Sequence, residues 1–157
     1  MAALAAAQLA ELADDGGPEP SVAAGHSIGE FNALVALGVL PLADALELVW
    51  ERGRAMQRHV PRADDGTSGF RLAVLDPSAA GLDDPQAEQL VADVAAATGE
   101  VLELVNRNAP GRQHAVAGTV AGLDALADAL ARRRSGSGDA LVLVGGIDVP
   151  FHSSVLR

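Results

Sequence analysis

A serine lies between two glycines near the N-terminus, in the segment Gly25-His26-Ser27-Ile28-Gly29-Glu30. A Gly-x-Ser-x-Gly segment between a strand and a helix is the nucleophile-elbow pattern, in which the glycines allow a turn tight enough to expose the serine hydroxyl. A helix that starts after the serine directs its N-terminal amides at an oxyanion formed there. The pattern therefore predicts Ser27 as a nucleophile.

A serine hydroxyl is a weak nucleophile and needs a neighbouring base. The candidate is His152, in the segment Val149-Pro150-Phe151-His152-Ser153, where the preceding Pro-Phe pair stiffens its approach. His26 adjoins the serine, but neighbouring residues at an elbow point in different directions, so we expect it to brace the turn. His59 and His114 have no feature that assigns them a role. The alternative for His152 is a loop histidine without a function.

Arg52 lies late in an expected helix, within Trp50-Glu51-Arg52-Gly53-Arg54. The planar guanidinium can bind a carboxylate with two parallel hydrogen bonds, so an acidic substrate would be bound here. The alternative is a solvated arginine near a helix end. Six of the carboxylates occur as pairs in expected turns, and we assign these six no catalytic role: Asp14-Asp15, Asp64-Asp65 and Asp83-Asp84.

The composition narrows the class of protein. The 157 residues suit one domain, or a larger body with a small insertion, and the net charge of −10 argues against nucleic-acid binding. The absence of cysteine excludes disulfides, a thiolate nucleophile and thiolate metal sites, and we predict no metal site. No apolar run approaches the roughly 20 residues of a membrane span, and no signal peptide is visible. We expect a cytoplasmic protein without a membrane partner.

The elements that must position these residues follow from hydrophobic periodicity and turn residues. Helices are expected over residues 3–12, 28–37 and 42–59, with a short buried strand over 22–25. Beyond them, strands over 70–75, 101–105, 114–117 and 140–144 alternate with helices over 85–97 and 120–133. This β-α-β-β-α-β order is that of the ferredoxin-like split unit. We therefore expect an α/β fold in which an α/β-hydrolase-like body (1–67 and 146–157) is interrupted by a ferredoxin-like subdomain (68–145).

Four segments in this order resemble the malonyl-CoA:acyl-carrier-protein acyltransferase family. They are the elbow Gly25–Glu30 with Asn32-Ala33-Leu34, then Arg52-Gly53 with Met56-Gln57, then Asn106–Gly111 leading to Ala117-Gly118, and finally Pro150–Ser153. Two further segments, Val60-Pro61-Arg62 and Gly145–Ser153, look most like the malonyl/palmitoyl transferase domain of fungal and actinobacterial type I fatty acid synthases.

The resemblance implies a role for each candidate. Ser27 would take the acyl group from a coenzyme A thioester as an ester, His152 would be the general base, and the amide of Ile28 would supply half of the oxyanion hole. Arg52 would pair with the malonyl carboxylate. Asn108 and Phe151 would also contact substrate, and the bulk of Phe151 favours malonyl over methylmalonyl groups. The acceptor would be the phosphopantetheine thiol of an acyl carrier protein, with no bound cofactor and with other synthase domains as partners.

The sequence also departs from this family. The Gly-Gln-Gly segment that supplies the other oxyanion donor is absent, and Gln8 lies in a helical alanine run instead. The residues expected after the histidine motif, including the group that orients the histidine, are also absent, which indicates the middle of a domain. Two alternatives stay open: a serine hydrolase of the α/β-hydrolase or patatin-like kind, and an inactive fragment of a larger synthase.

Overall fold

The computed structural model describes residues 2–18, 20–133 and 139–157. The chain divides into two compact units, Met1–Gln57 and Arg58–Arg157, which we call the elbow unit and the sheet unit. None of the helices in the described residues combines the length and the apolar character needed to cross a bilayer.

The elbow unit contains α1 (Ala2–Asp14), α2 (Gly29–Ala36) and most of α3 (Leu42–His59), whose last two residues belong to the sheet unit. These bounds agree with the three helices predicted from periodicity. Helix α1 packs against α2. Helix α3 has an acidic residue, Asp44, in its first turn and the basic Arg58 and His59 in its last, and this charge order complements the helix dipole.

The segment before the elbow differs from the prediction. Residues 22–25 run extended but form no strand, and the Val22 side chain is 82% exposed. A strand requires a hydrogen-bonded neighbour, and the described part of the elbow unit contains no other extended segment that pairs with it. The predicted buried strand is therefore wrong for this structure.

The sheet unit contains a mixed α/β fold with a small antiparallel sheet. Its elements are β1 (Phe70–Leu75), α4 (Asp84–Thr98), β2 (Leu102–Ala109), β3 (Gln113–Thr119), α5 (Val120–Ala131) and β4 (Leu141–Leu143), with short 3₁₀ turns at Ser78–Ala80 and Ser154–Leu156. The strands lie in the order β2-β3-β1-β4, and each neighbouring pair is antiparallel. The predicted succession of strands and helices is confirmed.

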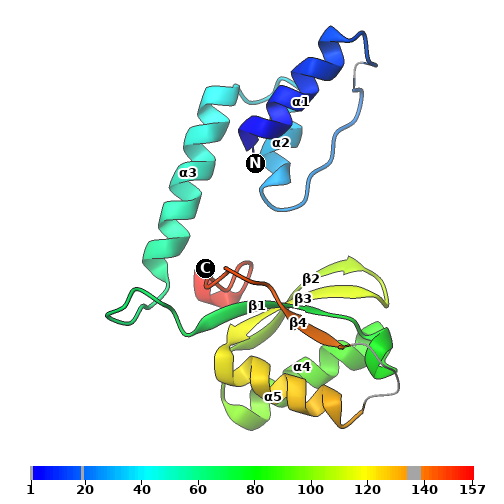
Figure 1. The fold of residues 1–157 in the computed structure, drawn as a ribbon, viewed down its shortest axis with the longest axis vertical. Coiled ribbons are helices and arrows are strands. Elements are labelled where there is room, and N and C mark those ends of the chain that lie inside the picture. Colours follow the sequence, from blue (N-terminus) through cyan, green and yellow to red (C-terminus); the bar gives the residue numbers. More distant parts are fainter. Residues whose placement is uncertain (1, 19, 134–138) are drawn as a thin grey trace. The chain divides into compact units, whose positions relative to one another are not determined.

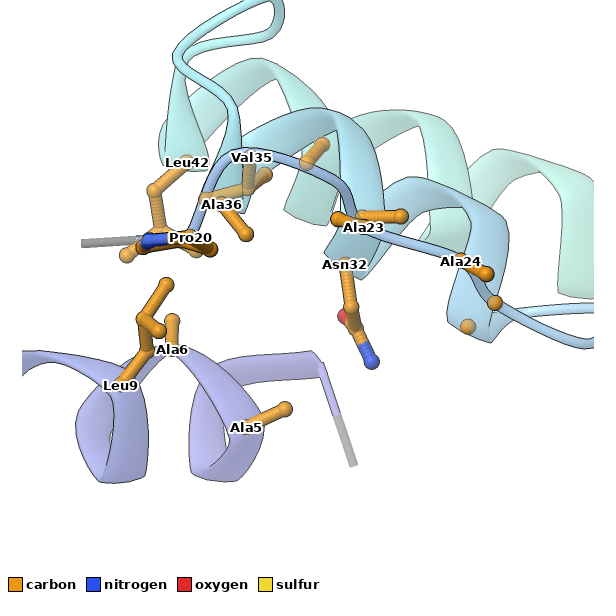
Figure 2. Close-up of a pocket in the computed structure, with 14 residues that line it drawn as sticks. Ala5, Ala6, Leu9, Pro20, Ala23, Ala24, Asn32, Val35, Ala36 and Leu42 are labelled. Carbon is orange, nitrogen blue, oxygen red and sulfur yellow. The ribbon is translucent and has the colours of Figure 1, made fainter. Parts of the chain in front are cut away.

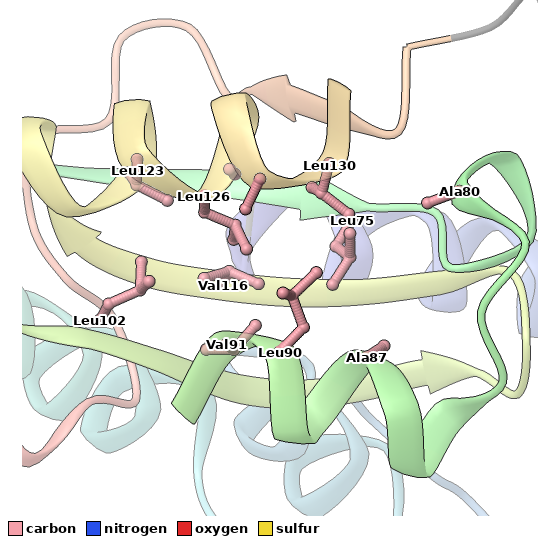
Figure 3. Close-up of a cluster of buried hydrophobic side chains, with 12 residues drawn as sticks. Leu75, Ala80, Ala87, Leu90, Val91, Leu102, Val116, Leu123, Leu126 and Leu130 are labelled. Atoms are coloured by element: carbon pink, nitrogen blue, oxygen red, sulfur yellow. The ribbon is translucent and has the colours of Figure 1, made fainter. Parts of the chain in front are cut away.

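Helices α4 and α5 cover one face of this sheet (Figure 1). Between helices and sheet lies an aliphatic core, in which alternate strand residues such as Leu75 and Val116 meet Leu90 of α4 and Leu126 of α5 (Figure 3). Both helices begin at capped ends. The Asp83 side chain accepts a hydrogen bond from the Gln86 backbone in a capping box, and Thr119 caps α5.

The β2–β3 hairpin is longer than predicted, because residues 106–109, which lie beyond the strand predicted over 101–105, continue β2. The tight turn spans Ala109 to Arg112, with a 3.1 Å hydrogen bond from the Arg112 amide to the Ala109 carbonyl. Pro110 and Gly111 occupy its centre, and Gly111 has φ +68°, which a glycine adopts without strain. The register slips twice in β2, so that Val105 and Asn108 are the extra residues of two bulges.

The other face of the sheet is covered by the C-terminal segment, which Figure 1 shows in red on the side away from α4 and α5. Val149, Pro150 and Ser153 of this segment are buried, as are the small residues Ala115 and Ala117 of β3. Small side chains on the strand allow the C-terminal segment to lie close to the sheet. The histidine motif is thus part of the packed sheet unit.

Candidate active site

The turn at Ser27 has the geometry that the elbow pattern predicts. Ser27 adopts φ +54°, a left-handed conformation that residues other than glycine rarely adopt. Hydrogen bonds close the turn from the Gly29 amide to the His26 carbonyl (2.9 Å) and from the Glu30 amide to the Ser27 carbonyl (3.1 Å). The serine therefore stands at a sharp reversal of the chain, immediately before α2.

Gly25 has no room for a side chain. A Cβ atom there would lie 1.9 Å from the Gly29 carbonyl oxygen, whereas a Cβ on Gly29 itself would meet nothing within 4 Å. The start of α2 crosses the backbone of Gly25 at van der Waals distance. The first glycine of the motif is thus required by close backbone approach.

Ile28 is the N-cap residue of α2, with helical φ −60° and ψ −23°. Among the hydrogen bonds of the described residues, none uses its amide hydrogen. An unoccupied amide at the positive end of a helix, next to a serine, has the position and polarity to donate to an oxyanion.

A mainly apolar cavity of about 340 Å³ lies beside the elbow, within the elbow unit (Figure 2). Leu9 of α1, Ala24 of the extended segment and Val35 of α2 contribute apolar walls, and Asn32 contributes an amide. The cavity shows that α1 and α2 do not close over the backbone that precedes the serine.

Arg52 is half-buried on α3. Two residues later, Arg54 forms an exposed 3.2 Å ion pair with Glu51, but Arg52 has no carboxylate partner among the described residues of its unit. A half-buried guanidinium without an internal partner is suited to an external carboxylate.

The His152 turn is the second place with unusual backbone. His152 has φ +65°, and Ser27 and His152 are the two non-glycine residues with positive φ in the part of the chain that the structure describes. The His152 side chain is exposed, whereas Ser153 is buried and its hydroxyl donates a 2.7 Å hydrogen bond to the Pro150 carbonyl. The turn is therefore exposed at His152 and packed at the next residue, Ser153.

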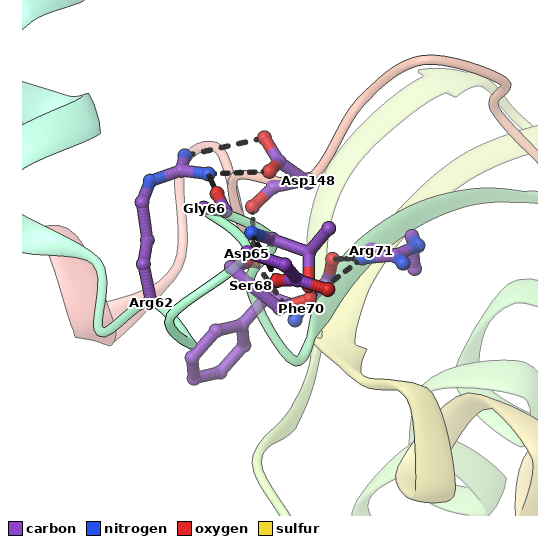
Figure 4. Close-up of polar contacts among 8 residues, drawn as sticks. Arg62, Asp65, Gly66, Ser68, Phe70, Arg71 and Asp148 are labelled. Atoms are coloured by element: carbon purple, nitrogen blue, oxygen red, sulfur yellow. Dashed lines mark hydrogen bonds and ion pairs between the residues drawn. The ribbon is translucent and has the colours of Figure 1, made fainter.

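An ion pair lies upstream of this turn. Arg62 donates two hydrogen bonds to the carboxylate of Asp148, of 2.5 and 3.3 Å, and a third of 2.6 Å to the Gly66 carbonyl (Figure 4). The Ser68 hydroxyl donates to the Asp148 carbonyl. The hydrogen bonds and charge of Arg62 hold the pKa of Asp148 below its usual range, and Asp148 raises the pKa of Arg62.

The remaining candidates also lie in the sheet unit. Asn108 is exposed at its bulge near the end of β2, and Phe151 is half-buried beside His152. A bulge re-aims a side chain away from the regular alternation of a strand, and bulges are common beside active sites. Ser27, Ile28 and Arg52 belong to the elbow unit, so the pairing of Ser27 with His152 stays a prediction.

A pair between a buried histidine and a half-buried aspartate was not foreseen from the sequence. His114 is fully buried, and its Nε2 lies 2.7 Å from the Asp84 carboxylate, which also accepts a 2.7 Å hydrogen bond from the Gly111 amide. The bonds from Gly111 and then His114 lower the pKa of Asp84. The pair joins the β2–β3 turn to the start of α4. No local pattern marks it, because Asp84 and His114 are 30 residues apart.

Comparisons with known proteins identify the family. A profile described as "Acyl transferase domain" matches residues 1–101. The chain is 37% identical over 142 residues to the malonyl CoA-acyl carrier protein transacylase of Escherichia coli K12, covering 90% of the chain and 41% of that protein. It is 34% identical over 169 residues to the fatty acid synthase beta subunit TOXC of Cochliobolus carbonum, covering 85% of the chain and 8% of that subunit.

Comparison with solved structures points to the same family. The acyl-carrier-protein S-malonyltransferase of Burkholderia pseudomallei superposes with a TM-score of 0.79 at 37% identity, covering 97% of the chain and 44% of that enzyme. The chain thus spans less than half the length of each of these relatives. The family match extends from α1 through the elbow and α3 into the sheet unit. The chain belongs to the acyl transferase domain family.

Proposed function

We propose that this chain carries the nucleophile, base and carboxylate-binding arginine of an acyltransferase that moves a malonyl group from coenzyme A to an acyl carrier protein in fatty acid biosynthesis. One observation carries the proposal. Left-handed backbone at non-glycine residues occurs, among the described residues, at Ser27 and His152, the two residues that acyl transfer requires. Such strain concentrates at functional sites.

In the first half-reaction, the Ser27 Oγ attacks the thioester carbonyl while His152 accepts its proton. The Ile28 amide, at the positive end of α2, donates to the oxyanion of the tetrahedral intermediate. The carbon–sulfur bond then breaks, His152 returns the proton to the departing thiolate, and malonyl-Ser27 remains.

The second half-reaction reverses this order with a different thiol. The phosphopantetheine thiol of the carrier gives its proton to His152 and attacks the ester carbonyl. The bond from carbon to the Ser27 Oγ breaks, and the serine regains a proton from His152. No bound cofactor takes part, and the coenzyme A thioester is a substrate. Arg52 binds the malonyl carboxylate during both halves.

We also propose the finer architecture that the sequence predicts. The antiparallel order β2-β3-β1-β4 with two helices on one face supports a ferredoxin-like subdomain over residues 68–145. Residues 1–67 and 146–157 would then belong to an α/β-hydrolase-like body.

The proposal is tested by incubating the protein with malonyl-CoA and measuring its intact mass, with and without carrier protein. Transfer predicts an adduct on Ser27 that disappears when carrier is added, and no adduct in Ser27→Ala. Free malonate released equally with and without carrier would indicate a hydrolase. Complete absence of an adduct in the wild-type chain would favour an inactive fragment.

The role of Arg52 has its own test. The ion pair with a malonyl carboxylate should contribute on the order of 2–4 kcal/mol, so Arg52→Ala should lower kcat/KM for malonyl-CoA by roughly two to three orders of magnitude. Acetyl transfer should change little, and Arg52→Lys should rescue malonyl transfer only partly. Arg54→Ala, on the same helix, is the control. Equal losses for malonyl and acetyl groups would instead assign Arg52 to the fold.

Phe151 is proposed to limit the acyl group at its α-carbon. Phe151→Ser should relax the preference for malonyl over methylmalonyl thioesters in direct competition, because it removes bulk beside His152. An unchanged ratio of products would contradict this role.

A further inference from the structure

The backbone at His152 is held by the structure around it. A left-handed non-glycine residue persists only where the surrounding structure over-determines it, and at His152 the buried neighbours Pro150 and Ser153 pack the turn on the sheet unit. The hydrogen bonds inside the turn join near neighbours, such as the Phe151 amide and the Val149 carbonyl at 2.9 Å. Hydrogen bonds to other parts of the sheet unit are made on both sides of the turn.

On the upstream side the support comes from Ser68 and Arg62, which precede Asp148 by 80 and 86 positions in the sequence. Ser68 and Arg62 contact the backbone and the side chain of Asp148, respectively. Arg62 is also hydrogen-bonded to the Gly66 carbonyl. The Arg62 guanidinium therefore links the loop before β1 to the start of the histidine motif, four residues before His152 (Figure 4). The Arg62 side chain is 24% exposed and the Asp148 side chain 32% exposed, so the pair is partly shielded from water.

On the downstream side the support comes from β2. Glu103 accepts hydrogen bonds from the Ser154 amide, at 3.0 and 3.2 Å to its two carboxylate oxygens, and from the Ser154 hydroxyl. A carboxylate placed at the start of the Ser154–Leu156 turn accepts from amides that would otherwise lack a partner. Glu103 lies on the sheet face opposite the helices, since its neighbours Leu102 and Leu104 face the core.

We propose that Arg62 and Glu103 are positioning residues for His152: through Asp148 and Ser154 they hold both ends of its turn and set the direction of the imidazole. This inference rests on the proposed function and goes beyond it, because neither residue contacts substrate in the mechanism above. It also gives a common role to two segments far apart in sequence, Val60-Pro61-Arg62 and Ile147-Asp148-Val149, which the ion pair joins.

The test must separate positioning from simple stabilisation. The variants are Arg62→Met, Glu103→Gln, Arg62→Lys and the charge swap Arg62→Asp/Asp148→Arg. The control is Gln89→Met, which breaks an exposed 2.7 Å hydrogen bond to Asp93 on α4 of the same unit. For each protein we would record the ring resonances of the four histidines by NMR across pH, with His152 assigned from His152→Gln, and the kcat and KM of Ser27 acylation.

Positioning predicts that Arg62→Met changes the chemical shift and titration midpoint of His152 while those of His59 and His114 stay as in wild type. It also predicts a fall of about tenfold in kcat, with KM for malonyl-CoA within about twofold, because a misdirected base slows proton transfer without weakening binding. Glu103→Gln should have a smaller effect of the same kind. Arg62→Lys should recover part of the loss, and the charge swap should recover more, even if Arg62→Met folds poorly.

The proposal is overturned if the His152 resonance is unchanged in folded Arg62→Lys and Glu103→Gln, or if kcat falls only in proportion to the unfolded fraction, as it would in Gln89→Met. A rise in KM with constant kcat would likewise contradict it. Failure of every variant, wild type included, to form acyl-Ser27 would contradict the proposed function, and the NMR comparison would still decide whether the two anchors position His152.

Discussion

The elbow unit and the sheet unit bury their apolar residues to very different degrees. In the sheet unit, Leu75, Val116, Leu123 and Leu126 are almost fully buried between sheet and helices. In the described residues of the elbow unit, Ala45 is the buried side chain. Its large apolar residues are mostly exposed, among them Leu4, Leu12, Val22, Val39, Leu48 and Trp50.

The two units also hold their left-handed turns, at Ser27 and at His152, in different ways. The Ser27 turn has a local fit, since Gly25 lies against the first residue of α2 and the two backbone hydrogen bonds that close the turn join residues three positions apart. The His152 turn is flanked by contacts with distant residues, since Arg62 and Glu103, which bond to Asp148 and Ser154, come from other parts of the sheet unit. A local turn can form without a core, whereas the distant contacts exist only once the sheet is assembled.

The largest expected effect comes from separating the units. Residues 58–157 expressed alone should unfold cooperatively in urea, with a free energy of unfolding on the order of 5 kcal/mol, because they contain a closed aliphatic core. Residues 1–57 alone should show no cooperative transition. Circular dichroism during urea titration measures both. A cooperative transition in residues 1–57 would show that the comparison is wrong.

The next largest effect is expected from truncating one apolar side chain in each unit and comparing the losses in the free energy of unfolding. Leu126→Ala removes a fully buried side chain from α5 and should lower the free energy of unfolding by about 2–5 kcal/mol. Leu48→Ala, at a site that is 49% exposed on α3, should change it by less than about 0.5 kcal/mol. The urea midpoints of the two variants measure the difference. Similar shifts for both would mean that Leu48 is packed in solution.

Two glycine substitutions test the local fit of the elbow. Gly25→Ala places a methyl group 1.9 Å from the Gly29 carbonyl oxygen, so the turn must open, at a cost of about 1–3 kcal/mol. Formation of acyl-Ser27 should fall sharply. Gly53→Ala on α3 meets nothing within 4 Å and should stabilise the helix by about 0.5–1 kcal/mol. Intact mass and thermal melting measure the two outcomes; normal acylation in Gly25→Ala would refute the requirement for glycine.

The smallest expected effect is the response of the sheet unit to acid. Because the native pKa values of Asp84 and Asp148 are lowered, their contributions are present above the unfolded-state pKa of about 4 and are lost as pH falls through the native values. The urea midpoint of the sheet unit should therefore fall below pH ~4. Asp148→Asn should be less stable at pH 7 and should lose less stability on acidification. An unchanged pH slope in Asp148→Asn would mean that the Arg62 pair does not contribute.

Local signals predicted many element bounds well. Helix α3 and strand β1 begin and end at the predicted residues, because apolar spacing and flanking turn residues act within a few positions. The prediction of a short strand before the elbow was wrong, and the predicted β2 was too short. Strand formation and strand length depend on a partner elsewhere in the chain. The bulge at Asn108 likewise exists only relative to β3.

By itself the sequence determined which residues we propose for the chemistry: a serine in a glycine turn, a histidine after Pro-Phe, and an arginine on a helix are all read from neighbouring residues. Only the tertiary structure decided which polar groups meet. The contacts of Arg62 with Asp148 and of His114 with Asp84 join residues 86 and 30 positions apart, and no local pattern specifies such a pairing. They arise because burial of the aliphatic core fixes the positions of the sheet, its helices and the C-terminal segment relative to one another. Polar side chains that this packing brings together then form hydrogen bonds.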